Sequence, residues 1–483
     1  MNIKSLEPQA VWGYFYELTQ IPRPTGTMEA ISRYIFEFGQ KLNLETEQDE
    51  VGNVIIRKPA SPGFEDRPRV VLQSHLDMVG QNNSDVVHDF TKDPIHTYVD
   101  GDWVKARGTT LGADNGIGVA YAMAVLADNS LKHGPFEALF TVDEEVGMDG
   151  ANGLKPGFVK GRIMINCDSE EEGKLFVGCA GGADLNVSFQ YKKGVPLFNG
   201  DVAVCLFLSG LKGGHSGLDI HLGRANANKL MFRFLKEAVR NYGVRLASIE
   251  GGTVRNAIPR EAKAVITLPK DDVEPLWELV SDYQDLYRME YEGIEDRIHF
   301  TAEMTNTPFM LIPEEIQDDL INAIEGCPNG VATFLTDFPG IVESSSNLSI
   351  IKSSEGLIEI KILARSSSES RKASLLSALE SVFSLACAKV EFGGTYNGWL
   401  PNIKSPILNV MANTHEKLYG KKPEIAVIHA GLECGIIQGI YPNMDLISFG
   451  PNLRNPHSPD EAVSISSVAR TWDFLKATLE HVT

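Results

Sequence analysis

The sequence predicts an α/β protein built as one domain with a mixed, mostly parallel sheet flanked by helices, into which a second, α+β domain is inserted. Three observations lead to this fold class. The chain has 483 residues, which exceeds the usual size of a single domain. Apolar strands alternate with amphipathic helices near both ends of the chain. In the middle of the chain the helices are longer and the strands do not end in acidic residues. We therefore expect the two ends to form one domain around an insertion.

The first part of that domain, residues 1–183, alternates helices with short apolar strands. Apolar side chains recur at helical spacing from Thr27 to Leu42, with Thr27 as the expected N-cap. A second helix is expected to begin at Asp114. Three runs that end in polar or acidic residues are typical of buried strands: 69–79, 135–142 and 162–167.

The middle of the chain, residues 184–396, is predicted to form the inserted domain. Its expected strands, 201–209 and 262–268, alternate with long helices at 226–241 and 273–291. Residues 397–483 return to the first domain with a strand at 444–449 and a final helix. The apolar stripe of that helix consists of Val468, Trp472, Leu475 and Leu479.

Composition and charge exclude several classes of protein. The longest apolar runs are far shorter than the roughly 20 residues that span a bilayer. With 44 Lys+Arg against 64 Asp+Glu, the net charge of −20 disfavours nucleic acid and anionic membranes as partners. The six cysteines form no Cys-x-x-Cys pair and the N-terminus has no secretion signal. We therefore expect a cytoplasmic protein with reduced thiols that bind no metal.

His75 and Asp77 stand two residues apart at the end of the first predicted strand. This spacing puts both side chains on one face of an extended chain, where a carboxylate can orient the imidazole of a metal ligand. For this pair alone, the alternative is a capping histidine and a loop aspartate.

Asp114 lies in a glycine-rich segment, residues 107–118, at the start of a predicted helix. Taken alone, it is best explained as an N-capping residue. The glycines also permit the close approach of a ligand. The segment lacks the Gly-Lys-Ser/Thr ending of a phosphate-binding loop, which argues against a nucleotide.

Further carboxylates and a histidine follow the other strands. Asp143, Glu144 and Glu145 come directly after one strand, and adjacent acids are unfavourable unless a cation neutralises them. A solvated acidic turn is the alternative. Asp168 ends the strand at 162–167, and residues 169–172 after it are expected to be solvated. His457 follows the strand at 444–449 in a proline-rich loop, where a lone histidine is usually only exposed.

Together, these positions form a set of metal ligands. The strand ends and adjoining loops supply His, Asp, Glu, Asp and His, a mixture of nitrogen and oxygen ligands that zinc accepts. In open α/β sheets, ligands bind outside the carboxyl ends of the strands. Five ligands are too many for one zinc ion that also holds water. We therefore expect two metal ions that share a bridging carboxylate.

These segments resemble the zinc aminoacylase and dipeptidase clan of metallopeptidases, and within it the cytosolic dipeptidases. The resemblance extends nearly from end to end and includes Leu211-Lys-Gly-Gly-His-Ser-Gly and Gly251-Gly-Thr-Val-Arg-Asn in the insert. The segments that carry it are His75-Leu-Asp77, Gly112-Ala-Asp114-Asn, Asp143-Glu-Glu-Val-Gly, Asn166-Cys-Asp168 and Asn455-Pro-His457-Ser-Pro-Asp-Glu.

The resemblance implies a role for each residue of the metal site. His75 and Asp168 would hold one zinc ion, Glu145 and His457 would hold the other, and Asp114 would bridge both. Cobalt or manganese are the expected substitutes. Asp77 would orient His75, and Glu144 would act as general base and then as general acid. The family pattern also implies a cis peptide bond after Asp114.

The resemblance further implies that the insert is a lid domain, which carries dimer contacts and substrate-binding residues. His215 would donate to the developing oxyanion, within its own subunit or across a homodimer. Asn256 and Arg365 would bind the substrate carboxylate, and Gly431 would line the pocket nearby. The alternatives are a solvated loop histidine for His215 and a surface salt bridge for Arg365.

The implied activity is hydrolysis of the peptide bond in unblocked dipeptides, Xaa-His types included, by a metal-activated water. Two alternatives stay open. An N-acyl amino acid deacylase would use the same metal site. A non-catalytic metal-binding protein on this fold would be expected to have lost the base, whereas Glu144 is present.

Overall fold

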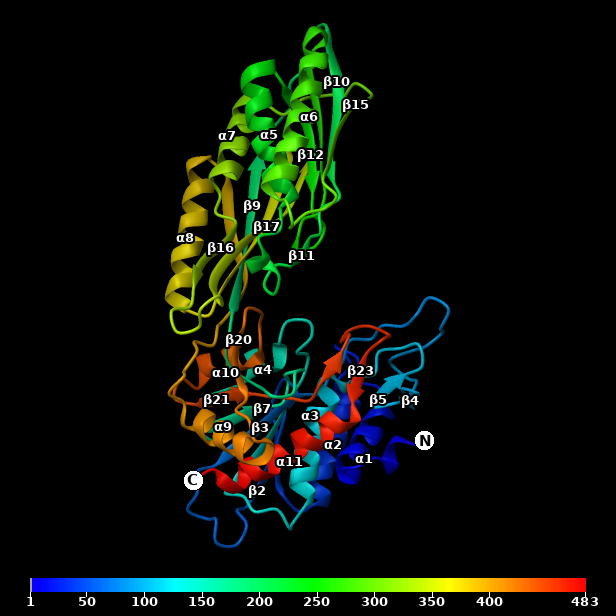
Figure 1. Ribbon diagram of the computed structural model, residues 1–483, viewed down its shortest axis with the longest axis vertical. Coiled ribbons are helices and arrows are strands. Elements are labelled where there is room, and N and C mark those ends of the chain that lie inside the picture. Colours follow the sequence, from blue (N-terminus) through cyan, green and yellow to red (C-terminus); the bar gives the residue numbers. More distant parts are fainter. Residues whose placement is uncertain (1) are drawn as a thin grey trace. The chain divides into compact units, whose positions relative to one another are not determined.

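The computed structural model describes residues 2–483 and separates into two compact units, each described here by itself (Figure 1). Unit 1 contains the residues up to 179 together with 399–427 and 432–483. Unit 2 contains residues 180–398 and the short segment 428–431. Both ends of the chain therefore belong to one unit.

Unit 1 is built on an eight-stranded mixed sheet with the strand order β1-β2-β6-β3-β7-β21-β8-β20. Its four middle strands, β6, β3, β7 and β21, are parallel to one another, and the β1–β2, β2–β6 and β21–β8 pairs are antiparallel. The strands are β1 (Glu45–Gln48), β2 (Val54–Lys58), β3 (Val70–His75), β6 (Phe136–Thr141), β7 (Ile163–Asn166), β8 (Lys174–Cys179), β20 (Glu424–Ile428) and β21 (Asp445–Ser448).

The middle strands form the core of unit 1. Every residue of β2, β3 and β6 is buried, which is consistent with the predominance of apolar residues in these strands. Because β3, β6 and β7 are parallel neighbours, their carboxyl ends meet at the same edge of the sheet. The residues that follow His75, Thr141 and Asn166 therefore converge.

Helices α3, α9 and α10 pack against this sheet (Figure 1). The helices of unit 1 are η1 (Ile3–Ser5), α1 (Gln9–Thr19), α2 (Glu29–Lys41), α3 (Ala113–Ala127), α4 (Asp149–Gly153), α9 (Pro406–Tyr419), α10 (Glu433–Ile440) and α11 (Ile465–His481). A smaller sheet has the order β22-β23-β5-β4. Its strands are β4 (Thr97–Asp100), β5 (Trp103–Ala106), β22 (Leu453–Arg454) and β23 (Ala462–Ser464).

One expected helix cap in unit 1 is wrong. Thr27 does not cap α2, which begins at Glu29 after Met28 and has no side-chain cap. The Thr27 hydroxyl instead donates to the Pro24 carbonyl at 2.8 Å, so it stabilises the preceding turn.

Unit 2 is an antiparallel sheet with helices, as expected of an α+β domain. The strand order is β15-β10-β14-β12-β17-β18-β9-β19, with β16 also paired to β17. These strands are β9 (Gly181–Gln190), β10 (Asp201–Ser209), β12 (Arg245–Gly251), β14 (Ala262–Pro269), β15 (His299–Met304), β16 (Gly330–Phe334), β17 (Val342–Ser354), β18 (Leu357–Ser366) and β19 (Lys389–Tyr396). A separate two-stranded ribbon joins β11 (Gly214–His215) to β13 (Ala257–Ile258).

Four long helices and the large sheet enclose the apolar core of unit 2. In β10, Val204, Leu206 and Leu208 belong to that core, whereas Phe207 is exposed. Such alternation is typical of a sheet that is covered on one face. The helices of unit 2 are η2 (Ile220–Leu222), α5 (Ala227–Tyr242), η3 (Lys270–Asp272), α6 (Val273–Glu290), α7 (Glu314–Gly326) and α8 (Glu369–Leu385).

Within residues 2–483, none of the helices combines the length and the apolar character that crossing a bilayer requires.

Candidate metal centre

The five predicted metal ligands lie together in unit 1. His75 is the last residue of β3, and Asp168 stands two residues beyond the end of β7. Glu145 lies in the loop after β6, and Asp114 lies in the first turn of α3. His457 lies in the loop that joins β22 to β23. Segments far apart in the sequence therefore supply one cluster.

Asp114 occupies the middle of this cluster. Its Oδ1 is 3.1 Å from Nε2 of His75, which is also 3.2 Å from Oδ1 of Asp168. Its Oδ2 is 3.2 Å from Nε2 of His457, which is also 2.9 Å from Oε2 of Glu145. Each carboxylate oxygen of Asp114 thus faces a different histidine, as a bridging ligand would.

The donor atoms fit two metal ions. Potential ligand atoms of His75, Asp114 and Asp168 lie within 4.8 Å of one another, and so do those of Asp114, Glu145 and His457. Oε1 of Glu145 is buried without a hydrogen-bond partner in the described chain, as expected of an atom that awaits a cation. Carboxylate oxygens and imidazole nitrogens are ligands that zinc accepts.

The backbone around these ligands is unusual at two positions. The peptide bond between Asp114 and Asn115 is cis, and Asp114 and Asn115 depart from helical geometry at the start of α3. His457 has a φ of 58°, in the left-handed region that non-glycine residues seldom adopt. The side chain of Asp114 makes no cap for α3, so the capping alternative is wrong.

Burial and the neighbouring carboxylates determine the pKa values of the two histidines in the cluster. Burial opposes a charge on His75, yet Asp168, Asp114 and Asp77 outweigh it and raise its pKa. Hydrogen bonds to Asp114 and Glu145 raise the pKa of His457 to about 11.

Asp77 contacts both His75 and the segment that carries Glu144. Its Oδ1 lies 3.3 Å from Nδ1 of His75, and its two oxygens accept the backbone N–H groups of Glu144 and Glu145 at 3.0 and 3.1 Å. The Thr25 hydroxyl donates to Oδ2 at 2.9 Å. Burial alone would raise the pKa of Asp77, but His75 and the two amides lower it to about 2. Asp77 is therefore a permanent anion that can orient His75.

Glu144 has the properties of a proton carrier. Burial and the neighbouring Asp168, Glu433 and Glu145 raise its pKa well above the ordinary range, against the opposing effect of His75. Its carboxylate can lie within 4.8 Å of ligand atoms of His75 and Glu145. A carboxyl with a raised pKa beside a metal site suits general acid–base chemistry. Asp143, by contrast, accepts the Gly26 N–H at 2.6 Å and belongs to none of the three ligand groups found in residues 2–483.

The segment after Asp168 differs from the expectation that it is solvated. Ser169 is buried, and its hydroxyl is hydrogen-bonded to that of Ser448 at 2.6 Å. Burial, together with Asp114 and Asp168, raises the pKa of Glu170 to about 8. Ser169 thus contacts β21, and the Glu170 carbonyl accepts the Leu453 N–H of β22 at 3.0 Å, so both residues lie next to the candidate metal centre.

Sequence patterns did not identify three buried charged residues around this site: Arg23, Glu433 and Glu461. Arg23 donates to the carbonyls of Leu76, Asp77 and Gly112. Glu461 is part of the His457-Ser-Pro-Asp-Glu motif, and that proximity to a ligand was the only available signal. Nothing in the sequence around Arg23 marks it as belonging to the site, and Glu433 is marked only by its proximity to Gly431, a predicted pocket residue.

Unit 2 contains the predicted substrate-binding residues. His215 is the last residue of β11, and its Nδ1 accepts the backbone N–H groups of Gly217 and Leu218 at 3.1 and 2.9 Å. These two contacts assign the proton of the neutral ring to Nε2. Burial and the charge of Arg365 lower the pKa of His215 to about 4. His215 is therefore a neutral donor at physiological pH, in an ordered ribbon.

Arg365 lies near the end of β18 and is only 5% exposed. Its Nη1 donates to the Tyr396 hydroxyl at 3.0 Å, and its Nε is buried without a hydrogen-bond partner. Within residues 2–483, no carboxylate pairs with it, so the surface salt bridge is wrong. A buried guanidinium without a counter-ion is suited to bind a carboxylate.

Asn256 and Gly431 lie in two other segments of unit 2. Asn256 is exposed in the turn before β13, and its carbonyl accepts the Ser216 N–H at 2.8 Å, next to His215. Gly431 belongs to the segment 428–431, which bonds to the backbone of Ala180. His429 in that segment is hydrogen-bonded to the Ser345 hydroxyl at 2.7 Å.

Comparison with known proteins identifies relatives along the whole chain. Residues 71–481 match the model of peptidase family M20/M25/M40. The chain is 45% identical over 482 residues to the cytosol non-specific dipeptidase of Escherichia coli K12, which covers 100% of this chain and 99% of the relative.

Solved structures give the same result. The crystal structure of aminoacylhistidine dipeptidase from Vibrio alginolyticus is 45% identical, with a TM-score of 0.94 over 100% of this chain and 98% of that chain. The aminopeptidase PepT from Bacillus cereus shares the fold at 16% identity and a TM-score of 0.58, over 99% of both chains. The resemblance seen in the sequence motifs, to the cytosolic dipeptidases of the metallopeptidase clan, is confirmed, and so is the α/β fold with its mixed sheet.

Proposed function

Because the chain belongs to peptidase family M20/M25/M40, we propose that it is a metal-dependent dipeptidase that hydrolyses unblocked dipeptides, including aminoacyl-histidine substrates. The observation that carries the proposal is the position of Asp114 between two histidines, each paired with a second carboxylate. Relatives that are 45% identical over the full chain are dipeptidases by name. They do not favour the N-acyl amino acid deacylase.

The ligand geometry supports a site for two zinc ions. His75 and Asp168 would hold one ion, Glu145 and His457 would hold the other, and Asp114 would bridge them. When bound, such ions lower the pKa of a water molecule towards neutrality and polarise the scissile carbonyl. Asp77 keeps the His75 ring in the orientation that presents Nε2 to the site.

Glu144 carries the proton through the reaction. Its carboxylate removes a proton from the attacking water as the new bond to the carbonyl carbon forms. The resulting carboxylic acid then donates that proton to the leaving amine nitrogen as the C–N bond breaks. Its raised pKa supports both steps, because a strongly acidic carboxyl would be a poor base.

The residues of unit 2 would bind the rest of the substrate. His215 Nε2–H would donate to the oxyanion, and its low pKa keeps the ring neutral for this purpose. Arg365 and Asn256 would bind the C-terminal carboxylate of the dipeptide, with Gly431 beside them. The unpartnered Nε of Arg365 supports this role.

We further propose a cytoplasmic homodimer in which unit 2 carries the contacts between subunits. The name of the Escherichia coli relative supports the compartment. The resemblance to the clan, which implies a lid domain with dimer contacts, supports the dimer.

The test is hydrolysis of a dipeptide panel by the purified protein before chelation, after chelation and after addition of Zn²⁺, Co²⁺ or Mn²⁺. We expect chelation to abolish hydrolysis and metal addition to restore it. Each dipeptide is matched with its N-acetylated form, which the proposed enzyme should leave intact. Preferential hydrolysis of the acetylated forms would contradict the proposal and favour the deacylase. Metal binding without any hydrolysis would favour a non-catalytic protein.

A further inference from the structure

Two buried charged side chains hold the loop that presents Asp114. We propose that Arg23 and Glu461 are positioning residues that fix the bridging carboxylate of Asp114 relative to the end of β3, and thereby set the metal affinity of the site. This inference rests on the proposed function, because it assigns Asp114 the role of a metal ligand. Both side chains are 2% exposed.

Glu461 binds the amino-terminal turn of α3. Its Oε2 accepts the N–H groups of Leu111 and Gly112 at 2.7 and 2.9 Å, and its Oε1 accepts those of Ala113 and Asp114 at 2.7 and 3.3 Å. The first N–H groups of a helix have no partner within the helix. Here a carboxylate from about 350 residues further along the chain accepts four successive N–H groups, two from residues that precede α3 and two from its first residues.

This contact excludes Glu461 as a metal ligand. Both of its oxygens are engaged by backbone N–H groups, and it belongs to none of the ligand groups in the described chain. Its effect on the site therefore passes through the backbone of residues 111–114, whose last member is the bridging aspartate.

Arg23 binds the same loop through a backbone carbonyl group. Its Nη1 donates to the carbonyls of Leu76 and Asp77 at 2.8 and 3.0 Å, and its Nη2 donates to the carbonyl of Gly112. One planar guanidinium thus joins the segment after His75 to the residue two positions before Asp114. The fixed fork of arginine allows this; the single ammonium of lysine cannot reproduce it.

The two contacts together determine where Asp114 lies. Its Oδ1 and Oδ2 face His75 and His457 at 3.1 and 3.2 Å, so a displacement of the loop would disturb both ligand groups at once. Metal–ligand distances tolerate only about 0.2 Å. Loss of an outer-shell partner commonly costs 10–100-fold in metal affinity.

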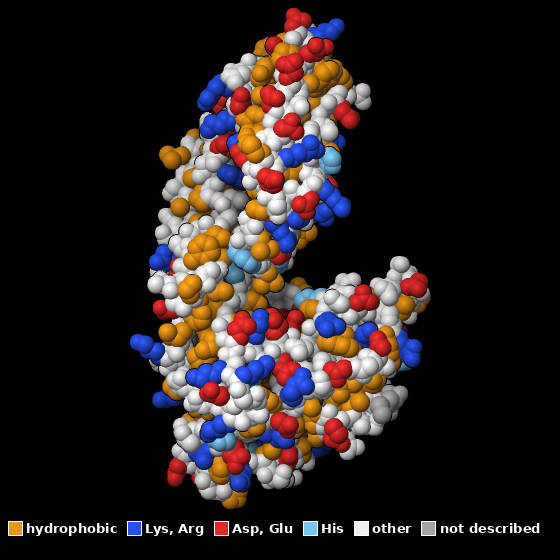
Figure 2. All heavy atoms as spheres, in the orientation of Figure 1, with side chains coloured by type: hydrophobic (Ala, Val, Ile, Leu, Met, Phe, Trp, Pro, Cys, Tyr) orange, Lys and Arg blue, Asp and Glu red, His pale blue; other side chains and the backbone are white. Residues whose placement is uncertain are grey.

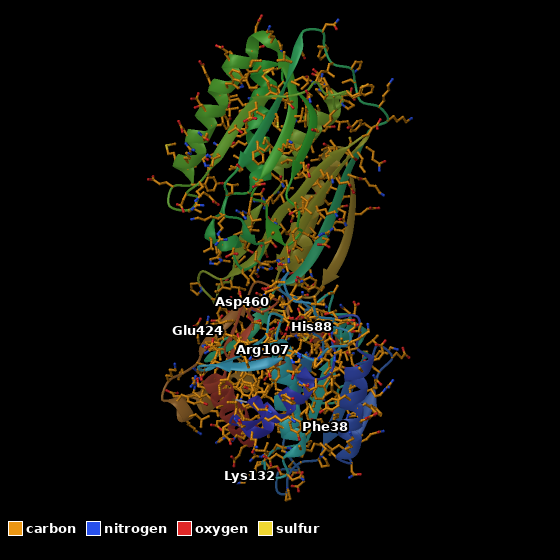
Figure 3. The ribbon with its side chains drawn as sticks, turned by 90° about the vertical axis from the view of Figure 1, so that its right-hand side faces the viewer. Phe38, His88, Arg107, Lys132, Glu424 and Asp460 are labelled. Atoms are coloured by element: carbon orange, nitrogen blue, oxygen red, sulfur yellow. The ribbon has the colours of Figure 1, made fainter. Side chains whose placement is uncertain are left out.

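The experiment measures Zn²⁺ binding to the metal-free protein by competition with a chromophoric chelator, in wild type, E461Q, E461D and R23K. The matched control is D460N, because Asp460 is the neighbouring acid and lies exposed at the surface of unit 1 (Figure 3). We expect at least a tenfold loss of Zn²⁺ affinity in E461Q and R23K, and none in D460N. At saturating Zn²⁺, kcat should fall with KM changed less than twofold, because the substrate-binding residues are untouched.

Thermal unfolding of the metal-free variants separates positioning from stability. A folded variant with weakened Zn²⁺ binding supports the proposal. Zn²⁺ affinity within twofold of wild type in both E461Q and R23K would overturn it. Failure of all three variants to fold without metal would also overturn it, since the role would then be structural. The binding measurement does not depend on turnover, so it stands even if the protein proves not to be a dipeptidase.

Discussion

At the scale of single residues, buried groups that are not among the proposed ligands hold the candidate metal centre. Asp77 lies beside His75 and also accepts the N–H groups of Glu144 and Glu145. One carboxylate thereby positions a ligand of one proposed ion, a ligand of the other, and the proposed base. A change at Asp77 should consequently affect metal binding and proton transfer together.

A second buried group, Glu433 at the start of α10, connects the strands that deliver the ligands. Its Oε2 accepts the Gln73 amide at 2.6 Å and the Thr141 hydroxyl at 2.8 Å. Gln73 in turn accepts the amide of Asn166 at 2.6 Å. Strands β3, β6 and β7 are thus linked just before His75, Glu144 and Asp168. Burial, with Asp168 and Asp77 nearby, raises the pKa of Glu433 to about 7, against the opposing effects of His75 and Thr141.

Two substitutions of Glu433 should distinguish the contribution of its hydrogen bonds to the unfolding free energy from that of its charge. E433Q keeps an oxygen that accepts from Gln73 and Thr141, so its unfolding free energy should lie within about 1 kcal/mol of wild type. E433A removes the buried oxygen that accepts from both the Gln73 amide and the Thr141 hydroxyl, and should cost about 2 kcal/mol or more. Urea denaturation of the metal-free proteins measures both values. Equal losses in the two variants would show that the hydrogen bonds to Glu433 are not what stabilises the strand ends.

At the scale of elements, local pattern and tertiary contact explain different parts of the structure. The runs at 69–79, 135–142 and 162–167 contain β3, β6 and β7, because buried parallel strands need continuous apolar residues. The cap of α3 could not be predicted in this way. Glu461, about 350 residues further along the chain, accepts the backbone N–H groups at the start of α3. The pattern of residues near Asp114 does not indicate so distant a partner.

In unit 2, the side chain of His429 connects the segment 428–431 to β17. The His429 ring bonds to the Ser345 hydroxyl, and the ring is only 7% exposed. Burial, together with the charge of Arg365, lowers the pKa of His429 to about 3. The folded protein therefore keeps this ring neutral at pH values where the unfolded chain binds a proton.

This difference predicts a pH dependence of stability. Because the folded-state pKa lies below the unfolded value of about 6.5, the stability contributed by neutral His429 is present above pH 6.5 and is lost as pH falls. From pH 7.5 to 5.5, wild type should lose about 1.4 kcal/mol relative to H429Q, measured by urea denaturation of the metal-free proteins. The control is H481Q, at an exposed histidine in the last turn of α11. Its unfolding free energy should change with pH by the same amount as that of wild type. If the unfolding free energies of wild type and H429Q changed equally with pH, His429 would not be the source of the pH dependence.

At the scale of the whole molecule, the charge of −20 has two components. Acidic and basic side chains are interspersed over the visible surface, as in an ordinary solvated protein (Figure 2). Asp77, Asp114, Glu144, Glu145 and Asp168 are different, because they are gathered at the carboxyl edge of one sheet. Bound dications would neutralise this group, which explains how the fold holds it together.

The five proposed ligands could be selected from the sequence because strand ends and spaced motifs are local features. His75, Asp114, Glu145, Asp168 and His457 each follow a recognisable apolar run or glycine-rich turn, and the structure brings all five together. Arg23, Glu433 and Glu461 could not be predicted, because a charged residue in a sequence is usually solvated, even where it stands beside a site motif as Glu461 does. Only the fold shows that these three are buried against the site.

The central claim is that Glu144 transfers the proton at a metal centre that other residues hold. Its most direct test is the E144A variant, assayed for bound zinc and for dipeptide turnover on the same preparation, with E171Q at an exposed acid as the control. We expect the zinc content of E144A to equal that of wild type and its kcat to be lower by about 10²–10⁴-fold. Full turnover in E144A would contradict the role of Glu144, and loss of the zinc would show that Glu144 is a ligand instead.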